Sequence, residues 1–223
     1  MIKLQNPRSR AGFTIVELMI ATLIFSLVVI LITVGVLSFT RAYYKGVNQS
    51  VTQNTTRLII EDIAQAIQFS GGDIQPVLTP TNNSEGMCIG GNVRYSFVRH
   101  KQLMDTTALG PNQTRHVLMR DKGASCAGGA ALDVENNSQT SACINGGNCT
   151  ELLDPRMRLA KLSVDPVAGT TDMFRVTIRV VYGDDDLLVN PTGDNAHCDV
   201  GLKGTEYCAQ SELTTIIKKR ITQ

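Results

Sequence analysis

A run of apolar residues from Phe13 to about Leu37 constrains the fold of this chain more than any other feature. A helix rises ~1.5 Å per residue, so the run is long enough to cross the ~30 Å hydrocarbon core of a bilayer. The segment ahead of it carries Lys3, Arg8 and Arg10 and no acidic residue, which predicts a cytoplasmic amino terminus. We therefore expect a single-pass protein of the cytoplasmic membrane whose remainder lies outside it.

One carboxylate, Glu17, is the fifth residue of this run. A charge in hydrocarbon costs at least ~2.5–3.5 kcal/mol, so an intramembrane acid indicates a function by default. A secretory signal has a shorter apolar core and a small-residue cleavage site behind it, whereas here the small residue, Gly12, stands in front. The alternative is a plain anchor whose Glu17 side chain reaches the membrane interface.

The helix is expected to continue beyond the membrane, over residues 13–69. Residues 44–56 are polar and contain Gly46, which predicts a weak middle. Residues 57–69 then place apolar side chains at helical spacing, and the SGGD at 70–73 ends the helix. The members of this stripe are Ile59, Ile60, Ile63, Ala66 and Ile67.

Strand signals follow the helix, after a loop-rich stretch over 70–91. Alternating apolar residues predict strands, and the clearest of them places Phe174, Val176 and Ile178 on one face. Loops are expected over 122–150 and 183–211. Because the apolar face of such a sheet needs a cover, we predict an α+β fold in which the long helix packs on an antiparallel sheet. The expected strands are 92–100, 115–121, 158–164, 171–183 and 212–221.

All six cysteines follow the apolar run, which favours disulfides formed in an oxidising compartment. The short loops 143–149 and 198–208 begin and end in cysteine and can close locally, which leaves one further pair. A metal site is disfavoured because no C-x-x-C occurs and only His197 adjoins a cysteine. The cysteines are Cys88, Cys126, Cys143, Cys149, Cys198 and Cys208.

The stretch RAG-FTIVELMIATLIFSLVVIL resembles the class III signal of type IV pilins and pseudopilins. The resemblance implies that a prepilin peptidase cuts between Gly12 and Phe13 and methylates the new amino terminus at Phe13. It also implies that Glu17 pairs with the amine of a neighbouring subunit in a filament, although the amine of its own helix is an alternative. The implied parts are a leader (1–12), a transmembrane and filament-core helix (13–37), an amphipathic helix (38–69) and a disulfide-containing globular domain (70–223).

Beyond the signal, the chain is similar to minor pilins of the W type and minor pseudopilins of the J type, which implies a priming or tip subunit of a pilus at the cell surface. The implied partners are the prepilin peptidase, other subunits, a membrane platform and an ATPase. The alternatives are a surface adhesin or DNA-binding tip module, and a type II secretion pseudopilin. A membrane-anchored enzyme is disfavoured, because no G-x-S-x-G, H-E-x-x-H or P-loop occurs.

Charged residues add little to the choice among these functions. The net charge of +1 gives no footprint for nucleic acid, and the KKR at 218–220 is a weak pointer to DNA that fits a solvated face better. No cofactor is expected. A weak calcium hypothesis rests on an acidic loop, for which a solvated turn is the simpler interpretation. Its carboxylates are Asp184, Asp185, Asp186 and Asp194.

Overall fold

The computed structural model describes residues 12–103, 116–122, 126, 129–134 and 149–220. The chain divides into two units at the bond between Tyr43 and Tyr44. One helix, α1 (Ile15–Gln68), begins in the first unit and ends in the second. The second unit holds the remaining elements. They are β1 (Ile74–Gln75), β2 (Glu85–Ile89), β3 (Val93–Phe97), β4 (Leu118–Lys122), β5 (Cys149–Glu151), β6 (Met157–Pro166), β7 (Met173–Tyr182), η1 (Asp185–Leu187), β8 (Leu188–Val189), β9 (His197–Cys198), η2 (Thr205–Tyr207) and β10 (Ala209–Lys218).

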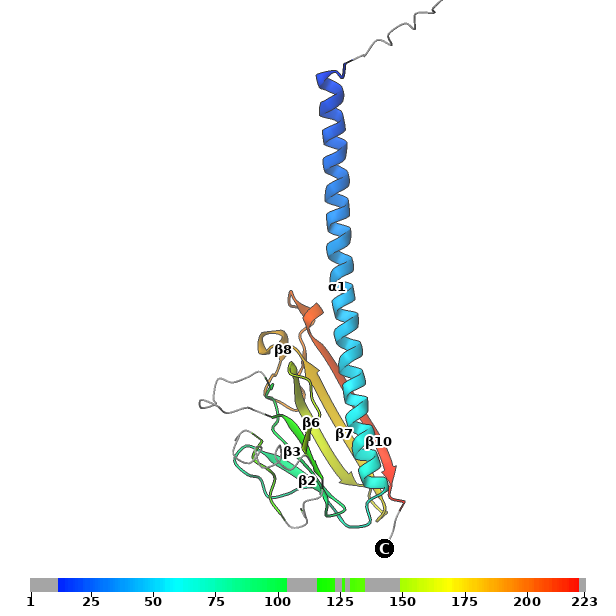
Figure 1. The fold of residues 1–223 in the computed structure, drawn as a ribbon, viewed down its shortest axis with the longest axis vertical. Helices are drawn as coiled ribbons and strands as arrows, with labels where there is room; N and C mark the ends of the chain where they lie inside the picture. The colour runs from blue at the N-terminus through cyan, green and yellow to red at the C-terminus, as the bar shows by residue number, and fades with distance from the viewer. Residues whose placement is uncertain (1–11, 104–115, 123–125, 127–128, 135–148, 221–223) are drawn as a thin grey trace, which may run out of the picture. The chain divides into compact units, whose positions relative to one another are not determined.

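The strands of the described residues form three antiparallel sheets. One is a meander of five strands in the order β1-β2-β3-β4-β5, and a second has the order β10-β7-β6. The third is the short pair β8-β9. In Figure 1 the long strands β6, β7 and β10 run beside the carboxyl-terminal part of α1. The expected α+β fold with a long amino-terminal helix and antiparallel strands is confirmed, with the strands distributed over three sheets.

The helix stays regular through residues 44–56, where a weak middle was expected. The reason lies in two threonines, Thr52 and Thr56, which are fully buried. Each hydroxyl donates a hydrogen bond to the carbonyl four residues earlier, at 2.8 Å to Asn48 and 2.7 Å to Thr52. Because the hydroxyls are satisfied within the helix, these polar residues contribute to its buried face.

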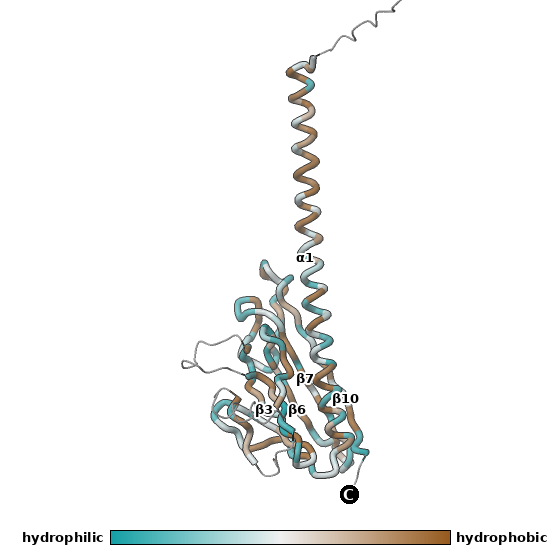
Figure 2. The backbone as a smooth tube through the Cα atoms, viewed as in Figure 1, coloured by the Kyte–Doolittle hydropathy of each residue, from teal (hydrophilic) through white to brown (hydrophobic). Residues whose placement is uncertain are grey.

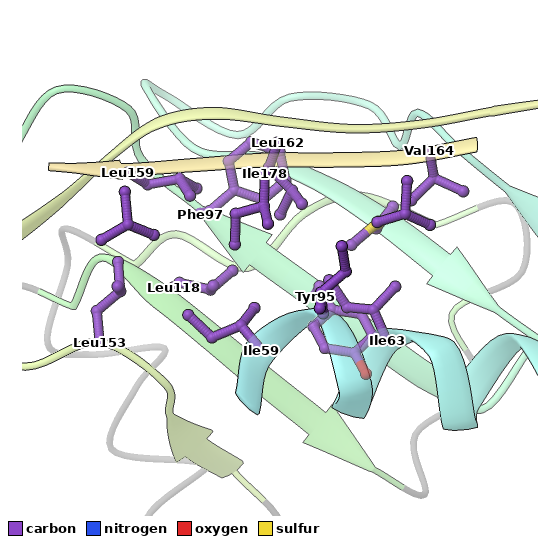
Figure 3. Packing of buried hydrophobic residues seen from close by; sticks show 14 of the residues in the cluster. Ile59, Ile63, Tyr95, Phe97, Leu118, Leu153, Leu159, Leu162, Val164 and Ile178 are labelled. Carbon is purple, nitrogen blue, oxygen red and sulfur yellow. The ribbon is translucent and has the colours of Figure 1, made fainter. Parts of the chain in front are cut away.

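The apolar stripe of α1 forms one side of the main core. Ile59, Ile60, Ile63 and Ile67 are buried, as their spacing predicts. Figure 3 shows Ile59 and Ile63 pointing toward residues of two sheets, among them Tyr95 of the five-stranded sheet and Ile178 of the three-stranded sheet. Because α1, the five-stranded sheet and the three-stranded sheet all contribute side chains to this core, α1 packs against both larger sheets.

The strands differ from the predicted ones in several places. β1 and β2 lie inside the stretch 70–91 that was expected to be loop, β8 and β9 lie inside the expected loop 183–211, and β5 begins at the end of the expected loop 122–150. β10 begins at Ala209 rather than at 212. β2 was missed because Gly86 weakens the strand signal. The structure requires that glycine: a Cβ there would lie 2.9 Å from the Cβ of Ala131 and 3.0 Å from the carbonyl oxygen of Tyr95.

Candidate functional site

The first turn of α1 is closed by a reciprocal pair of side chains, Thr14 and Glu17. The backbone N–H of Thr14 donates to Oε2 of Glu17 at 3.0 Å, and the Thr14 hydroxyl donates to the same oxygen at 2.9 Å. In return, the backbone N–H of Glu17 donates to Oγ1 of Thr14 at 3.2 Å. This is a capping box, which satisfies backbone donors that have no partner inside the helix. Among the residues that the structure describes, none supplies a cation to Glu17.

The bond between Gly12 and Phe13 lies in non-helical, exposed chain directly before this cap. A Cβ at Gly12 would meet no atom within 4 Å, and the backbone there is not left-handed. The fold therefore places no demand for glycine at this position. Phe13 is likewise exposed. The junction is therefore accessible to solvent.

The part of α1 that follows the cap is apolar, and its side chains are exposed on every side of the helix. Figure 2 shows this part as mainly brown with paler stretches between, and all large apolar side chains from Ile15 to Phe39 are exposed. The hydroxyls of Thr22, Ser26, Thr33 and Thr40 donate to carbonyls of the helix itself at 2.8–3.0 Å. No charged residue occurs between Glu17 and Arg41. The helix is long and apolar enough to cross a membrane, which fits membrane anchoring.

Two disulfides join cysteines that the structure describes at both ends. Cys88 pairs with Cys126, and Cys198 pairs with Cys208, with Cα–Cα distances of 5.9 and 5.8 Å. Both agree with the pairings expected from the sequence. Cys149 is also disulfide-bonded. Cys143 lies outside the described residues, so the pairing of Cys143 with Cys149 stays a prediction.

Two of the four aspartates of the calcium hypothesis are paired with arginines. Asp185 accepts an ion pair from the buried Arg158, whose other amino group donates to the carbonyl of Gly183 at 2.9 Å. Asp194 accepts from Arg99 at 3.1 Å. Asp184 and Asp186 are exposed. Within the described ranges, no group of three acidic, His or Cys side chains is arranged to hold a metal ion.

The basic run at 218–220 is engaged within the fold. Lys218 pairs with Asp172 at 3.3 Å, and Nζ of Lys219 donates to the carbonyl of Gly72 at 2.8 Å. The guanidinium of Arg220 lies 5.9 Å from the ring centroid of Phe69. Lys218 thus contacts the residue before β7, while Lys219 and Arg220 contact residues just beyond α1, so each of the three basic side chains has a partner within the fold.

Sequence reasoning missed two sets of residues. The partner of Glu17 in the cap had a signal, because T-x-x-E at 14–17 before an apolar run is a capping-box signature. The second set is a cluster of Asp62 of α1, Tyr95 of β3 and Arg120 of β4. Oη of Tyr95 donates to Oδ2 of Asp62 at 2.8 Å, and Arg120 pairs with Oδ1. Burial, and then the charge of Asp62, raises the pKa of Tyr95. No sequence pattern links these three positions.

Comparison with known proteins bears on the amino-terminal site. Residues 7–33 match a family model described as a prokaryotic N-terminal methylation motif. No curated protein and no solved structure shows a significant match to the chain. The matched residues include Gly12, Phe13, Thr14 and Glu17. The match supports a type IV pilin-like amino-terminal signal, which implies processing by a prepilin peptidase and assembly with other subunits, and it suggests a structural subunit rather than an enzyme.

Proposed function

We propose that this protein is a minor type IV pilin or pseudopilin. It is cut between Gly12 and Phe13, methylated on the new amine of Phe13, and assembled through α1 into a pilus or pseudopilus as a priming or tip subunit. The observation that carries the proposal is the junction itself: an exposed glycine that the fold does not require, just before a capped apolar helix in which Glu17 is the single charged residue ahead of Arg41. The matched methylation motif supports it.

In this proposal Glu17 has two consecutive roles. Before cleavage its carboxylate caps α1 through Thr14. Cleavage creates a positive amine at Phe13, and in a filament the amine of one subunit lies beside Glu17 of its neighbour. Pairing offsets much of the cost of burying both charges among packed apolar helices. A membrane platform and an ATPase drive this assembly.

The first test is intact mass and amino-terminal sequencing of the protein from its native membrane. We expect a chain that begins at N-methyl-Phe13. A chain that begins at Met1 would refute the proposal and leave Glu17 as a cap on an ordinary anchor.

Two variants separate the roles of Glu17. Glu17→Gln keeps a side chain that can accept from Thr14 but removes the charge, whereas Glu17→Ala removes both. We expect both variants to be processed at Gly12 and both to be absent from sheared filaments. Normal assembly of Glu17→Gln beside failure of Glu17→Ala would show that the cap suffices and would refute the charge pairing. Thr14→Ala, which weakens the cap and keeps the charge, is the matched control and should still assemble.

The rival function, a DNA-binding tip module, has less support. Its main sequence signal is the basic run at 218–220, and two of these side chains bind groups of the fold while the third lies over an aromatic ring. Retention of double-stranded DNA by the full chain in detergent, at physiological salt and lost on raising the salt, would favour that rival.

A further inference from the structure

The strand β10 forms one edge of the three-stranded sheet in the second unit, whose order is β10-β7-β6. It pairs with β7 from Ala209 to Lys218 without a break in register. No strand of the described part of the chain pairs with its other edge, and Figure 1 shows β10 as the outermost strand of its sheet. A free edge presents a row of backbone donors and acceptors to any extended segment that approaches it.

Hydrogen bonds at the two ends of β10 show which of its residues face outward. The backbone N–H of Lys219 donates to the carbonyl of Asp172, next to β7, so the odd-numbered residues are those that bond to β7. The carbonyl of Gln210 instead accepts from Nε2 of Gln49 in α1, at 3.0 Å. In an antiparallel pair, alternate residues direct both backbone groups to the same side. The residues whose N–H and C=O groups point away from β7 in the open stretch are therefore Glu212, Thr214 and Ile216.

The helix α1 borders this edge and leaves a groove beside it. Gln49 contacts one end of the edge, and at the other end the carbonyl of Gln68 accepts the backbone N–H of Arg220 at 3.0 Å. Near the first end, a groove of about 500 Å³ separates the helix from the strand. This volume is in the ~300–1,000 Å³ range of ordinary binding sites. The groove is lined by Ser50, Gln53, Asn54 and Arg57 of α1 and by residues 210–213 of β10.

The outer edge of β10 lacks the features that keep edge strands unpaired. Residues 209–218 contain no proline or glycine, and the register has no bulge. The two charged side chains of the strand, Glu212 and Lys218, are already paired with Arg179 and Asp172 of the same chain. Residues 213–217 between them are uncharged and mostly β-branched. A long, regular edge with such a centre is expected to pair with another chain.

The position of α1 decides what kind of chain fits. Neighbouring strands lie ~4.8 Å apart, whereas packed helices need ~8–10 Å between their axes. Because Gln49 and Gln68 of α1 contact the edge at both ends, two copies joined antiparallel through β10 would bring their helices into the same space. A single extended segment brings no helix. Charge complementarity then requires a basic residue opposite Glu212 and an acidic residue opposite Lys218.

We propose that the outer edge of β10 binds an extended segment of a different, neighbouring subunit, which adds to the sheet as a further strand beside α1. The backbone of the segment pairs with the outward groups of Glu212, Thr214 and Ile216. The inference rests on the proposed function, in which the neighbours of a priming or tip subunit are other subunits. It gives the second unit an assembly contact that is independent of Glu17.

A peptide of residues 209–220 is a suitable probe, because an antiparallel copy of this sequence places a lysine opposite Glu212 and a glutamate opposite Lys218. Its binding to the full chain in detergent micelles is followed by fluorescence anisotropy of a label on the peptide. Thr214→Pro removes an N–H that points outward and breaks no bond to β7, so the sheet is kept. Thr214→Ala is the matched control, because it loses the same side chain and keeps the N–H.

We expect the native chain and Thr214→Ala to bind the peptide equally and Thr214→Pro to bind it at least about tenfold more weakly. A second pair of variants tests the groove without altering the strand. Gln53→Trp fills the groove, whereas Leu58→Trp places the same side chain at an exposed position of α1 that does not line it. Gln53→Trp should weaken binding, and Leu58→Trp should leave it unchanged.

Three results would overturn the inference. The first is failure of the peptide to bind the native chain. The second is equal binding to the native chain, Thr214→Pro and Gln53→Trp, which would place the peptide elsewhere. The third is a dimer of the native chain in detergent that Thr214→Pro abolishes, because a second copy would then occupy the edge.

Analysis of sheared filaments distinguishes failure of the inference from failure of the proposed function. We expect Thr214→Pro to be cut after Gly12 and yet to be absent from filaments, while Thr214→Ala is cut and present. Equal assembly of both variants would remove the edge contact and leave the proposed function intact. A native chain that is not cut after Gly12 would remove the proposed function, and the inference with it.

Discussion

Replacement of Asp62 by alanine should destabilise the second unit more than its partly exposed position suggests. Asp62 accepts from the fully buried Tyr95 and pairs with Arg120. Asp62→Ala leaves a phenol and a guanidinium without their acceptor. Removing one partner of a buried pair costs ~3–5 kcal/mol. Because the Asp62 and Arg120 side chains are 23% and 19% exposed, water screens part of this. We expect the free energy of unfolding to fall by about 2–3 kcal/mol.

A double-mutant cycle tests the reasoning. Tyr95→Phe removes one hydrogen bond to a charged acceptor and should cost about 1.5 kcal/mol in the native background. In the Asp62→Ala background it should cost almost nothing. The assay is urea denaturation of the full chain in detergent micelles, followed by near-ultraviolet circular dichroism. Arg57→Ala is the control, since it breaks an exposed pair with Glu61 that is worth about 0.5 kcal/mol.

Two results would refute the argument. One is an Asp62→Ala cost no larger than that of Arg57→Ala. The other is an equal cost of Tyr95→Phe in both backgrounds, which would mean that the phenol does not depend on Asp62.

The same cluster predicts a loss of stability in alkali. Burial, and then Asp62, raises the pKa of Tyr95 above the ordinary value of 10.0. Above that pH the unfolded chain releases the phenol proton while the folded chain keeps it, so the free energy of unfolding falls as pH rises. Tyr95→Phe should remove this part of the decline. An unchanged slope in the variant would contradict it.

Three further predictions concern the second unit. Burial lowers the pKa of His100 against the opposing effect of Asp194, so the unfolded chain takes up the proton at a higher pH than the folded chain. The free energy of unfolding should therefore fall as the pH drops below about 6.5. His100→Asn, which tolerates the left-handed φ of 63° at that position, should flatten this decline in urea titrations repeated across pH. Ile63→Ala should cost about 2–5 kcal/mol in urea denaturation, whereas the exposed Leu58→Ala stays within about 0.5 kcal/mol, and equal costs would contradict the buried stripe. Joint replacement of Cys88 and Cys126 by alanine should lower the free energy of unfolding by about 2–4 kcal/mol, measured beside the reduced native chain.

The elements that could be predicted from the sequence are those whose buried residues recur at the regular spacing of a helix or a strand. In β7 the alternation places Val176, Ile178 and Val180 in the core and leaves Arg175 exposed, as the pattern predicts. Thr177, which the pattern places on the solvated face, is buried instead. The stripe of α1 follows from the helical spacing of its isoleucines. Both patterns are readable because each side chain meets an environment set by its own backbone geometry.

The structural features that the sequence did not predict depend mainly on contacts between segments that are far apart in the chain. Gly86 weakened the signal for β2, although Ala131 and Tyr95 leave no room for a larger residue there. Thr52 and Thr56 are polar in sequence, yet their hydroxyls bond within the helix and their side chains are buried. At the amino-terminal site, the roles of Gly12, Phe13 and Glu17 are predicted by the resemblance to type IV pilins. The cap formed by Thr14 and Glu17 was not predicted, although T-x-x-E is a local capping-box signature.

The order in which the chain is made gives the shared core a further consequence. The stripe of α1 ends at Ile67, but the strands β6 and β7 that cover it begin only at Met157 and Met173. Synthesis runs from the amino end, so the part of the four-isoleucine surface that the three-stranded sheet covers stays exposed until most of the chain has followed. Contacts this distant in sequence form slowly, and uncovered surfaces associate with other chains meanwhile. A chain truncated before β6 keeps the membrane helix and the apolar face of α1 but lacks the whole three-stranded sheet. Such a truncated chain is therefore expected to aggregate at the membrane.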